Sequence, residues 1–157
     1  MKVIVLSGVS GSGKSTWIKE NHPSAYVVSA DHYFLTTGGE YRFDASKLSA
    51  AHGACFREFI VATQNSTEES FPIVVDNTNT TDVEISPYML VAQAYCLPSE
   101  IVTLMPRRGR DVGWVDLTKC AERNKHGVSL QAIEAQDARI QARNLPPWWT
   151  ETRVPMK

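Results

Sequence analysis

Residues 8–15 combine the glycines, the lysine and the hydroxyl that a bound polyphosphate requires. They read Gly-Val-Ser-Gly-Ser-Gly-Lys-Ser and are followed by Thr16. Glycines let the backbone turn several N–H groups toward one anion, and a helix starting here adds the positive end of its dipole. Lys14 would reach the β- and γ-phosphates, and the Ser15 hydroxyl would hold Mg²⁺. The pattern predicts a nucleotide-binding loop, with a ligand-free glycine turn as the alternative; its members are Gly8, Ser10, Gly11, Ser12, Gly13, Lys14, Ser15 and Thr16.

Two aspartates follow short apolar segments and could complete this chemistry. Asp31 comes after residues 26–29, and Asp76 follows residues 71–75. A phosphoryl transfer to an alcohol needs a carboxylate within hydrogen-bond reach of the attacking hydroxyl, and we expect Asp31 to be this catalytic base. Asp76 would hold a Mg²⁺ water or contact the acceptor. The structural alternative for both residues is the capping of a turn.

A basic segment lies in the second half of a chain whose net charge is only −1. It consists of Arg107, Arg108, Arg110, Lys119, Arg123 and Lys125. Such a segment can close over phosphates as a lid, here at about residues 107–127, or it can be a solvated helix face. We expect Arg123 to place its guanidinium on the transferring phosphate as a third catalytic residue beside Asp31 and Lys14, although spacing alone does not decide which arginine of the segment does so.

The elements that must position these residues alternate between strand and helix. Apolar runs predict strands at 2–7, 26–29, 71–76 and 101–105. Helical spacing predicts helices from 15, after Asp44, after Asp82, and over 111–125 and 129–143. The alternation predicts a single α/β domain over 1–157, a P-loop NTPase three-layer sandwich with a parallel sheet of about four to five strands flanked by helices. Ligands bind outside the carboxyl ends of such strands, where the loop, Asp31 and Asp76 would meet.

Composition places the chain among globular proteins of a reducing compartment. The apolar fraction is 43%, the charged fraction is 21%, and the three cysteines fit no disulfide or metal pattern. We expect no signal peptide, no membrane span and a cytoplasmic location, in the host cytoplasm if the chain is phage-encoded. The four histidines are expected to be structural or exposed. Trp148 and Trp149 could stack on bases, although docking on the core is the expected role.

An ordered set of segments resembles the kinase domain of polynucleotide 5′-kinases. The set comprises residues 11–17, 29–33, 75–79 and 123–124. Residues 41–44, 51–52 and 123–128 are closest to the branch similar to NEDD4-binding protein 2, which includes small phage-encoded kinases. The similarity covers the chain to about residue 143.

This resemblance implies an ATP-dependent, Mg²⁺-dependent kinase that acts on a hydroxyl of a nucleic acid. Asp31 matches the family's general base, Lys14 and Ser15 match its nucleotide and Mg²⁺ contacts, and Arg123 matches a lid arginine. Ser15 and Asp76 are the expected metal contacts, and Asp31, Asp76 and Asn79 are expected on the acceptor side.

The chain also departs from the family pattern. Phe34 stands where the phage polynucleotide kinase has an arginine that grips the acceptor strand, and the lid is shorter after Asn124. Nucleotide binding is unaffected by these changes, but two acceptors remain open. One is the 5′-hydroxyl end of a polynucleotide, and the other is the hydroxymethyl group of 5-hydroxymethyluracil in phage-type modified DNA.

Three functions are therefore compatible with the sequence. The favoured one is a nucleic-acid hydroxyl kinase whose partners are DNA and a nucleoside triphosphate, with no membrane and no obligate protein partner. The second is a small-molecule kinase for a nucleoside, sugar or antibiotic, which would enclose its acceptor in a pocket. The third is a non-catalytic nucleotide-binding module, which would have no need of Asp31 opposite the γ-phosphate.

Overall fold

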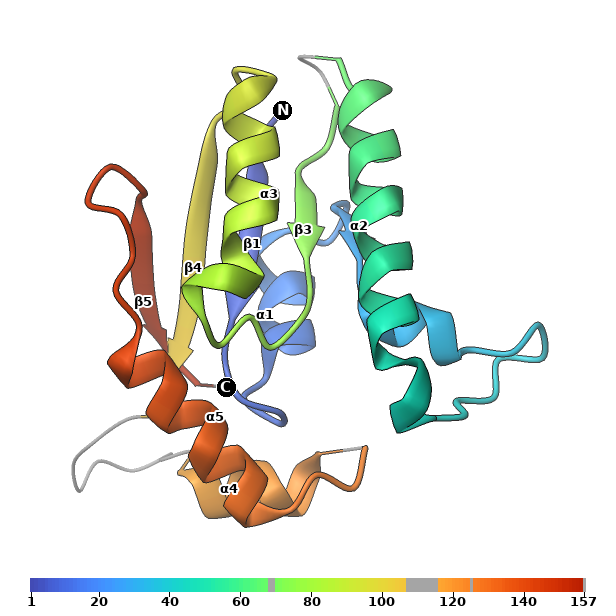
Figure 1. The fold of residues 1–157 in the computed structure, drawn as a ribbon, viewed down its shortest axis with the longest axis vertical. Helices are drawn as coiled ribbons and strands as arrows, with labels where there is room; N and C mark the ends of the chain where they lie inside the picture. The colour runs from blue at the N-terminus through green and yellow to red at the C-terminus, as the bar shows by residue number, and fades with distance from the viewer. Residues whose placement is uncertain (68–69, 107–115, 125, 157) are drawn as a thin grey trace.

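A parallel sheet of five strands forms the centre of the molecule, in the order β2-β3-β1-β4-β5 (Figure 1). The computed structural model describes residues 1–67, 70–106, 116–124 and 126–156. The strands are β1 (Val3–Ser7), β2 (Tyr26–Val28), β3 (Ile73–Val75), β4 (Ser99–Met105) and β5 (Glu151–Pro155). The expected α/β sandwich with a parallel sheet is confirmed, and β5 is the strand that the sequence pattern did not indicate.

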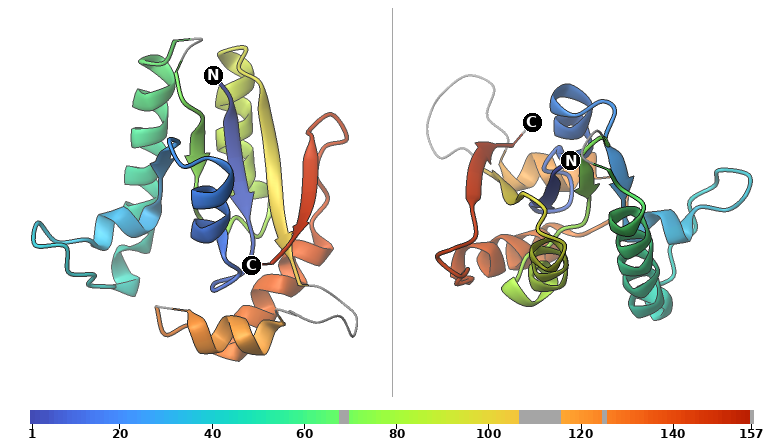
Figure 2. Two further views of the ribbon diagram at one scale, coloured as in Figure 1. Left: turned by 180° about the vertical axis from the view of Figure 1, so that it is seen from behind. Right: turned by 90° about the horizontal axis from the view of Figure 1, so that it is seen from above.

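Helices cover both faces of the sheet and its carboxyl end (Figures 1 and 2). The helices are α1 (Lys14–Asn21), α2 (Leu48–Gln64), α3 (Asp82–Ala94), α4 (Leu117–Arg123) and α5 (Leu130–Ala142), with short 3₁₀ turns η1 (Ala30–Phe34) and η2 (Ala45–Lys47). Helices α2 and α3 lie on one face and α1 on the other, whereas α4 and α5 lie across the ends where β1 and β4 stop. This last pair is therefore placed beside the predicted nucleotide loop.

The central strand β1 shows why the apolar runs become buried strands. Val3 and Val5 pack into the core beneath α2 and α3, whereas Ile4 and Leu6 pack into the core on the α1 side. Successive side chains of a strand point to opposite faces, so a strand covered on both faces needs an unbroken apolar run. The five residues of β1 are accordingly all buried.

Two helix starts differ from the expected ones. Thr81, rather than Asp82, caps α3: its hydroxyl accepts a hydrogen bond from the backbone of Glu84, whose side chain returns to the cap. Asp44 caps η2 through the backbone N–H of Ser46, and α2 follows directly from that turn. Asp82 is thus the first residue of its helix, because a hydroxyl one position earlier supplies the cap.

The last third of the chain is also corrected in detail. Helix α4 begins at Leu117 with Asp116 as its cap, although the sequence predicted a start at residue 111; residues 111–115 lie outside the described part. The tail beyond α5 returns to the sheet as β5. Trp149 docks in the core as expected, while Trp148 is 72% exposed.

Arg143, just after α5, connects three strands of the sheet. Its side chain is 2% exposed, and it donates to the Ser7 hydroxyl over 2.5 Å, to the Thr103 hydroxyl over 2.6 Å and to the Glu151 carboxylate. These partners stand on β1, β4 and β5. Among the helices that the structure describes, none combines the length and apolar character needed to cross a bilayer.

Candidate active site

The loop of residues 8–13 curls at the carboxyl end of β1 into a cleft of about 340 Å³. Gly11 and Gly13 take φ angles of +76° and +92°, which favour glycine, and α1 begins directly after them. The cleft is lined by Ser10, Gly11, Gly13, Lys14, Ser15, Thr16, Lys19, Asp31, Asp76, Asn77, Thr78, Arg123, Asn124 and His126. This one cavity therefore brings together residues of the nucleotide loop, Asp31, Asp76 and Arg123.

Lys14 is folded back over the loop that carries it. Its Nζ donates to the backbone oxygens of Gly8 over 3.0 Å and Val9 over 3.1 Å. Burial lowers the pKa of Lys14, while the nearby charges of Asp76 and Asp31 oppose that shift. A polyphosphate would replace these neutral carbonyl partners with charged oxygens, which are stronger acceptors for an ammonium group.

Ser15 and Asp76 form an oxygen pair suited to Mg²⁺. The Ser15 hydroxyl donates to Oδ2 of Asp76 over 3.2 Å. Burial raises the pKa of the Asp76 carboxyl, with the Lys14 charge acting in the opposite direction. Mg²⁺ favours hard oxygen ligands and keeps several waters, so one hydroxyl, one carboxylate and the substrate phosphates satisfy it. The described residues contain no cluster of three or more histidine, cysteine or acidic side chains, in keeping with such a sparse site.

Asp31 is held opposite this pair by contacts between the ends of β2 and β3. The Ser29 hydroxyl donates to the backbone oxygen of Asp76 over 2.8 Å, and the Ala30 N–H donates to the Asn77 side chain over 2.9 Å. These bonds fix the first turn of η1, so that the Asp31 side chain, 52% exposed, faces the cleft. An accessible carboxylate in this place can accept a proton from a hydroxyl.

Arg123 reaches the nucleotide loop from α4. Its Nε donates to the backbone oxygen of Gly11 over 2.6 Å. Helix α4 approaches so closely that a Cβ at Gly11 would overlap the carbonyl oxygen of Cys120. Lys119 is exposed on the same helix. The other members of the predicted basic segment, Arg107, Arg108, Arg110 and Lys125, lie outside the described residues.

Asn79 is not brought to the cleft. It is 3% exposed, its Nδ2 donates to the backbone oxygen of Leu6 over 2.7 Å, and its φ is +42°. The side chain therefore braces the turn after β3, so the geometry gives no support to the acceptor-side role expected for it. Ser12 and Gly8 are likewise buried inside the loop rather than on its surface.

No site role was predicted for three residues that the structure places here: Gln136 and Tyr41 went unnoticed, and His126 was expected to be structural or exposed. Gln136 of α5 accepts from the Ser10 N–H over 2.8 Å and so supports the loop. The Tyr41 hydroxyl donates to Oδ1 of Asp31 over 3.0 Å, and Nε2 of His126 lies 3.5 Å from Oδ2. Their positions in the chain are far apart, and the only sequence signal was that residues 41 and 126 fall in segments resembling the kinase branch.

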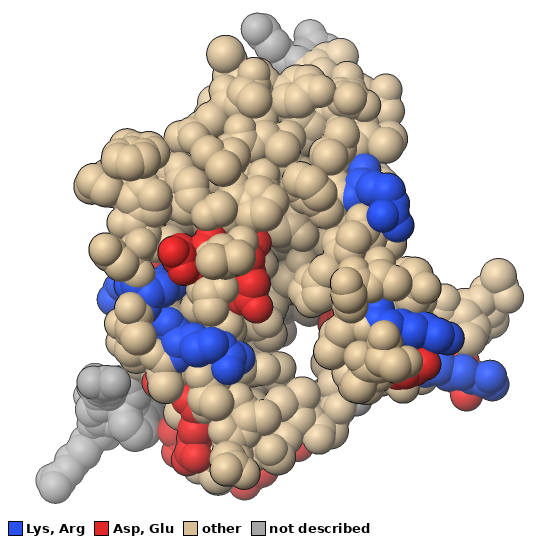
Figure 3. Space-filling view, in the orientation of Figure 1, with Lys and Arg blue, Asp and Glu red and all other residues tan. Residues whose placement is uncertain are grey.

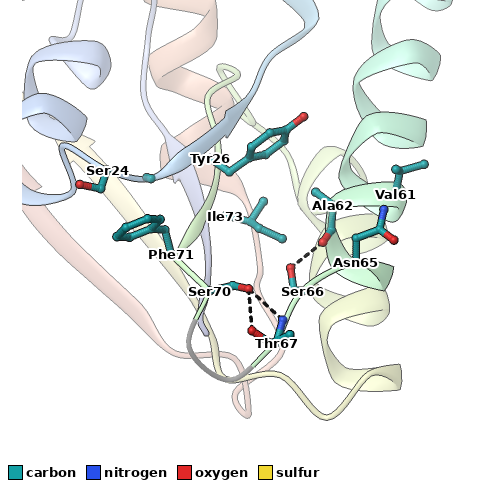
Figure 4. Close-up of a pocket in the computed structure, with 11 residues that line it drawn as sticks. Ser24, Tyr26, Val61, Ala62, Asn65, Ser66, Thr67, Ser70, Phe71 and Ile73 are labelled. Atoms are coloured by element: carbon teal, nitrogen blue, oxygen red, sulfur yellow. Dashed lines mark hydrogen bonds between the residues drawn. The ribbon is translucent and has the colours of Figure 1, made fainter.

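A second and larger hollow, of about 610 Å³, lies near the amino ends of β2 and β3 (Figure 4). Figure 4 shows the Phe71 and Tyr26 rings on either side of Ile73, with residues from the end of α2 beyond them. The described side chains that line this hollow include no acidic or basic group. It therefore lacks the phosphate-binding and proton-accepting groups that the cleft at the other end of the sheet brings together.

Known proteins share both the sequence pattern and the fold. The chain is 34% identical over 140 residues to human NEDD4-binding protein 2. The matched region covers 83% of this chain and 7% of that protein. The chain thus spans a small fraction of the length of this relative. Two solved structures share the fold at lower identity.

One is the RNA repair complex Pnkp1/Rnl/Hen1, with a TM-score of 0.63 at 16% identity, covering 89% of this chain and 44% of the other. The other is a gluconokinase from Sinorhizobium meliloti, with a TM-score of 0.58 at 15% identity. The match covers 99% of this chain and 82% of the gluconokinase chain. The P-loop kinase fold and the family imply nucleotide binding. With residues 3–143 matching the AAA domain family, this chain belongs to that family.

Proposed function

We propose that this chain is an ATP-dependent kinase that transfers the γ-phosphate to a hydroxyl of a nucleic acid. The observation that carries the proposal is the accessible Asp31 carboxylate, which shares one cleft with Lys14, Ser15 and Asp76. A module that only binds nucleotide has no use for a proton acceptor there. A kinase with an alcohol acceptor requires one.

The residues divide the reaction between them. The loop N–H groups and Lys14 bind the β- and γ-phosphates, while Ser15 and Asp76 would hold Mg²⁺, which would neutralise charge on the phosphates. Asp31 accepts the proton of the acceptor hydroxyl as that oxygen bonds to the γ-phosphorus. The bond between this phosphorus and the β–γ bridging oxygen breaks, and ADP leaves with the bonding electrons.

In this mechanism Arg123 stabilises the negative charge of the transferring phosphoryl group. Its Nε donates to the Gly11 carbonyl, which holds the guanidinium beside the loop that would bind the transferring phosphoryl group. A guanidinium in this position stabilises charge that spreads over those oxygens during transfer.

Two features support a nucleic acid as the acceptor. The segments that resemble polynucleotide 5′-kinases include the loop, Asp31, Asp76 and Arg123, which all lie on the cleft. In addition, Figure 3 shows a hollow between the α4–α5 end of the molecule and the segment that follows η1. An acceptor site that opens to solvent suits the end or side of a strand better than an enclosed small molecule.

The test is transfer of labelled γ-phosphate from ATP, with Mg²⁺, to three acceptors in parallel. These are a 5′-hydroxyl oligonucleotide, DNA with internal 5-hydroxymethyluracil and blocked ends, and a mixture of nucleosides. Label on either nucleic acid supports the proposal and identifies its branch. Label on nucleosides alone contradicts it in favour of a small-molecule kinase, and no label on any acceptor contradicts the kinase assignment.

A further inference from the structure

The two oxygens of the Asp31 carboxylate have different neighbours. The Tyr41 hydroxyl donates to Oδ1 over 3.0 Å, whereas Nε2 of His126 lies 3.5 Å from Oδ2. The rings of Tyr41 and His126 also contact each other, with centroids 4.6 Å apart. The proposed base is therefore flanked by one side chain that follows η1 and another from the connection between α4 and α5.

Tyr41 is held in this place by the segment that carries it. Residues 34–42 double back on themselves: Leu35 bridges to Tyr41 in antiparallel fashion, and the Arg42 N–H donates to the Phe34 oxygen over 2.9 Å. Phe34, 4% exposed, anchors Tyr41, and the centroids of the two rings are 6.1 Å apart. Burial and the Asp31 charge raise the pKa of Tyr41, so its hydroxyl remains a donor at neutral pH.

His126 stands on a connection that is itself braced. The Asn124 side chain accepts from the Val128 N–H over 2.8 Å and donates to the Val128 oxygen over 3.0 Å. His126 lies between Asn124 and Val128 in the chain, and its side chain, 35% exposed, points toward Asp31. It occupies the side of the carboxylate that faces the cleft, and His126 itself lines the cleft.

We propose that Tyr41 and His126 complete the acceptor subsite, which takes an alcohol. Tyr41 is a positioning residue that holds Oδ1 so that Oδ2 is directed at the acceptor, and His126 occupies the place of the acceptor hydroxyl until that hydroxyl displaces it. This inference rests on the proposed role of Asp31 as base. A hydroxyl hydrogen-bonds at about 2.7 Å, closer than the imidazole now stands, so the exchange improves the contact to Oδ2.

The first test is Tyr41→Phe, which keeps the ring and removes the hydroxyl. Without the bond to Oδ1, Asp31 rotates more freely, and kcat is expected to fall about tenfold, in line with the loss of a hydrogen bond to a charged group. The KM for ATP stays unchanged. Tyr26→Phe is the matched control, because the Tyr26 hydroxyl contacts Glu58 at the other end of the sheet. An unchanged kcat in Tyr41→Phe overturns the positioning role.

The second test is His126→Gln, which removes the imidazole from its place opposite Oδ2. The KM for the acceptor is expected to fall several-fold, because the acceptor hydroxyl no longer competes with a side chain, while the KM for ATP is unaffected. A KM for the acceptor that stays the same or rises overturns the displacement, since His126 would then be neutral or would itself bind the acceptor. Thermal unfolding of each variant verifies that the fold is intact.

Hydrolysis of ATP, in which water replaces the alcohol, separates this inference from the proposed function. Hydrolysis that depends on Tyr41, without transfer to any nucleic acid, supports the Tyr41 assignment and contradicts the acceptor class. Transfer to a nucleic acid that is equally fast in Tyr41→Phe contradicts the subsite alone. If Asp31→Asn slows neither hydrolysis nor transfer, both inferences fail together.

Discussion

At the scale of single residues, Asp31 and Asp76 face the same cleft in different surroundings. Asp31 is half exposed beside two side chains that can donate hydrogen bonds to it, whereas Asp76 is partly buried and close to Lys14. An accessible carboxylate can exchange a proton with a substrate, and a less accessible one beside a hydroxyl can hold a metal-bound water. The roles proposed for the two acids therefore differ because their environments differ.

The sharpest prediction concerns Asp31→Asn. ATP affinity is expected to be retained, because Asp31 contributes no group to the phosphate-binding loop, while kcat falls by roughly 10²-fold or more from loss of the general base. Single-turnover transfer and equilibrium ATP binding measure the two effects separately. Asp82→Asn, at the exposed first turn of α3, is the control, and equal rates in both variants would remove Asp31 from the mechanism.

A second prediction follows from the raised pKa of Asp76. The folded protein binds this proton more tightly than the unfolded chain does, so the stabilising effect of the proton is lost as the pH rises through the folded-state pKa. Asp76→Asn is therefore expected to raise the Tm at pH 7 without nucleotide or Mg²⁺, and to weaken Mg²⁺-dependent ATP binding. Calorimetric unfolding and ATP titrations measure these effects, and a lower Tm in the variant would contradict the cause given for the shift.

At the scale of elements, the contact between α4 and the nucleotide loop depends on Gly11. A side chain there would meet the Cys120 carbonyl, and the backbone φ is +76°. The same contact brings Arg123 to the Gly11 oxygen. The absence of a side chain at Gly11 therefore allows α4 to pack directly against the nucleotide loop.

Gly11→Ala is expected to displace α4 and to lower kcat by at least tenfold through loss of the Arg123 placement, since a guanidinium on the transferring phosphate is worth 10³-fold or more. Gly39→Ala is a matched control for backbone strain, because Gly39 has a φ of +78° and nothing lies within 4 Å of its Cβ position. Both variants carry the same conformational cost, of about 1 kcal/mol. Equal kcat values in the two variants would show that the clash with α4 has no catalytic consequence.

Among the strands that the structure describes, sequence patterns missed only β5, at one edge of the sheet. β1, β3 and β4 are apolar because both of their faces are covered, so their runs are visible without a structure. β5 reads Glu-Thr-Arg-Val-Pro, and its place at the sheet edge leaves most of its side chains exposed or half exposed. Only its pairing with β4 defines it as a strand.

The residues of the site likewise divide into those that the sequence predicted and those that only the structure brings together. The nucleotide loop, Asp31 and Asp76 stand at the ends of predicted strands, and the parallel sheet brings those ends together. Tyr41 and His126 lie in the segments that follow η1 and α4, and they reach Asp31 through tertiary contacts, such as that between the Phe34 and Tyr41 rings, that leave no pattern in the sequence. Asn79 was expected in the acceptor site on resemblance alone, and its buried amide instead satisfies the Leu6 carbonyl.

At the scale of the whole molecule, Arg143 connects β1, β4 and β5 in one polar cluster. The hydrogen bonds from Thr103 and Arg143 lower the pKa of Glu151, although burial alone would raise it. Ionised Glu151 therefore stabilises the fold above the ordinary glutamate pKa of 4.5, and this contribution is lost as the pH falls through the lowered, folded-state value.

Arg143→Leu is expected to lower the free energy of unfolding by about 3 kcal/mol, because among the described residues the partly buried Glu151 charge then keeps only the exposed Arg153 as its ionic partner. The double variant Arg143→Leu/Glu151→Leu is expected to recover most of that loss, since the partly buried carboxylate at this position is gone and Arg153 is exposed to solvent. Urea unfolding at pH 7 measures both. A double variant as unstable as the single one would show that Arg143 acts through Ser7 and Thr103 instead.

The strand order has a consequence for synthesis on the ribosome. β1 is the middle strand, yet it emerges first, and its neighbours β3 and β4 start only at Ile73 and Ser99. At elongation rates of about 5–20 residues per second, this apolar strand waits several seconds with both edges unpaired. This segment is thus exposed before its partner strands have been made, and slower decoding before residue 73 would lengthen the time during which a chaperone must cover it.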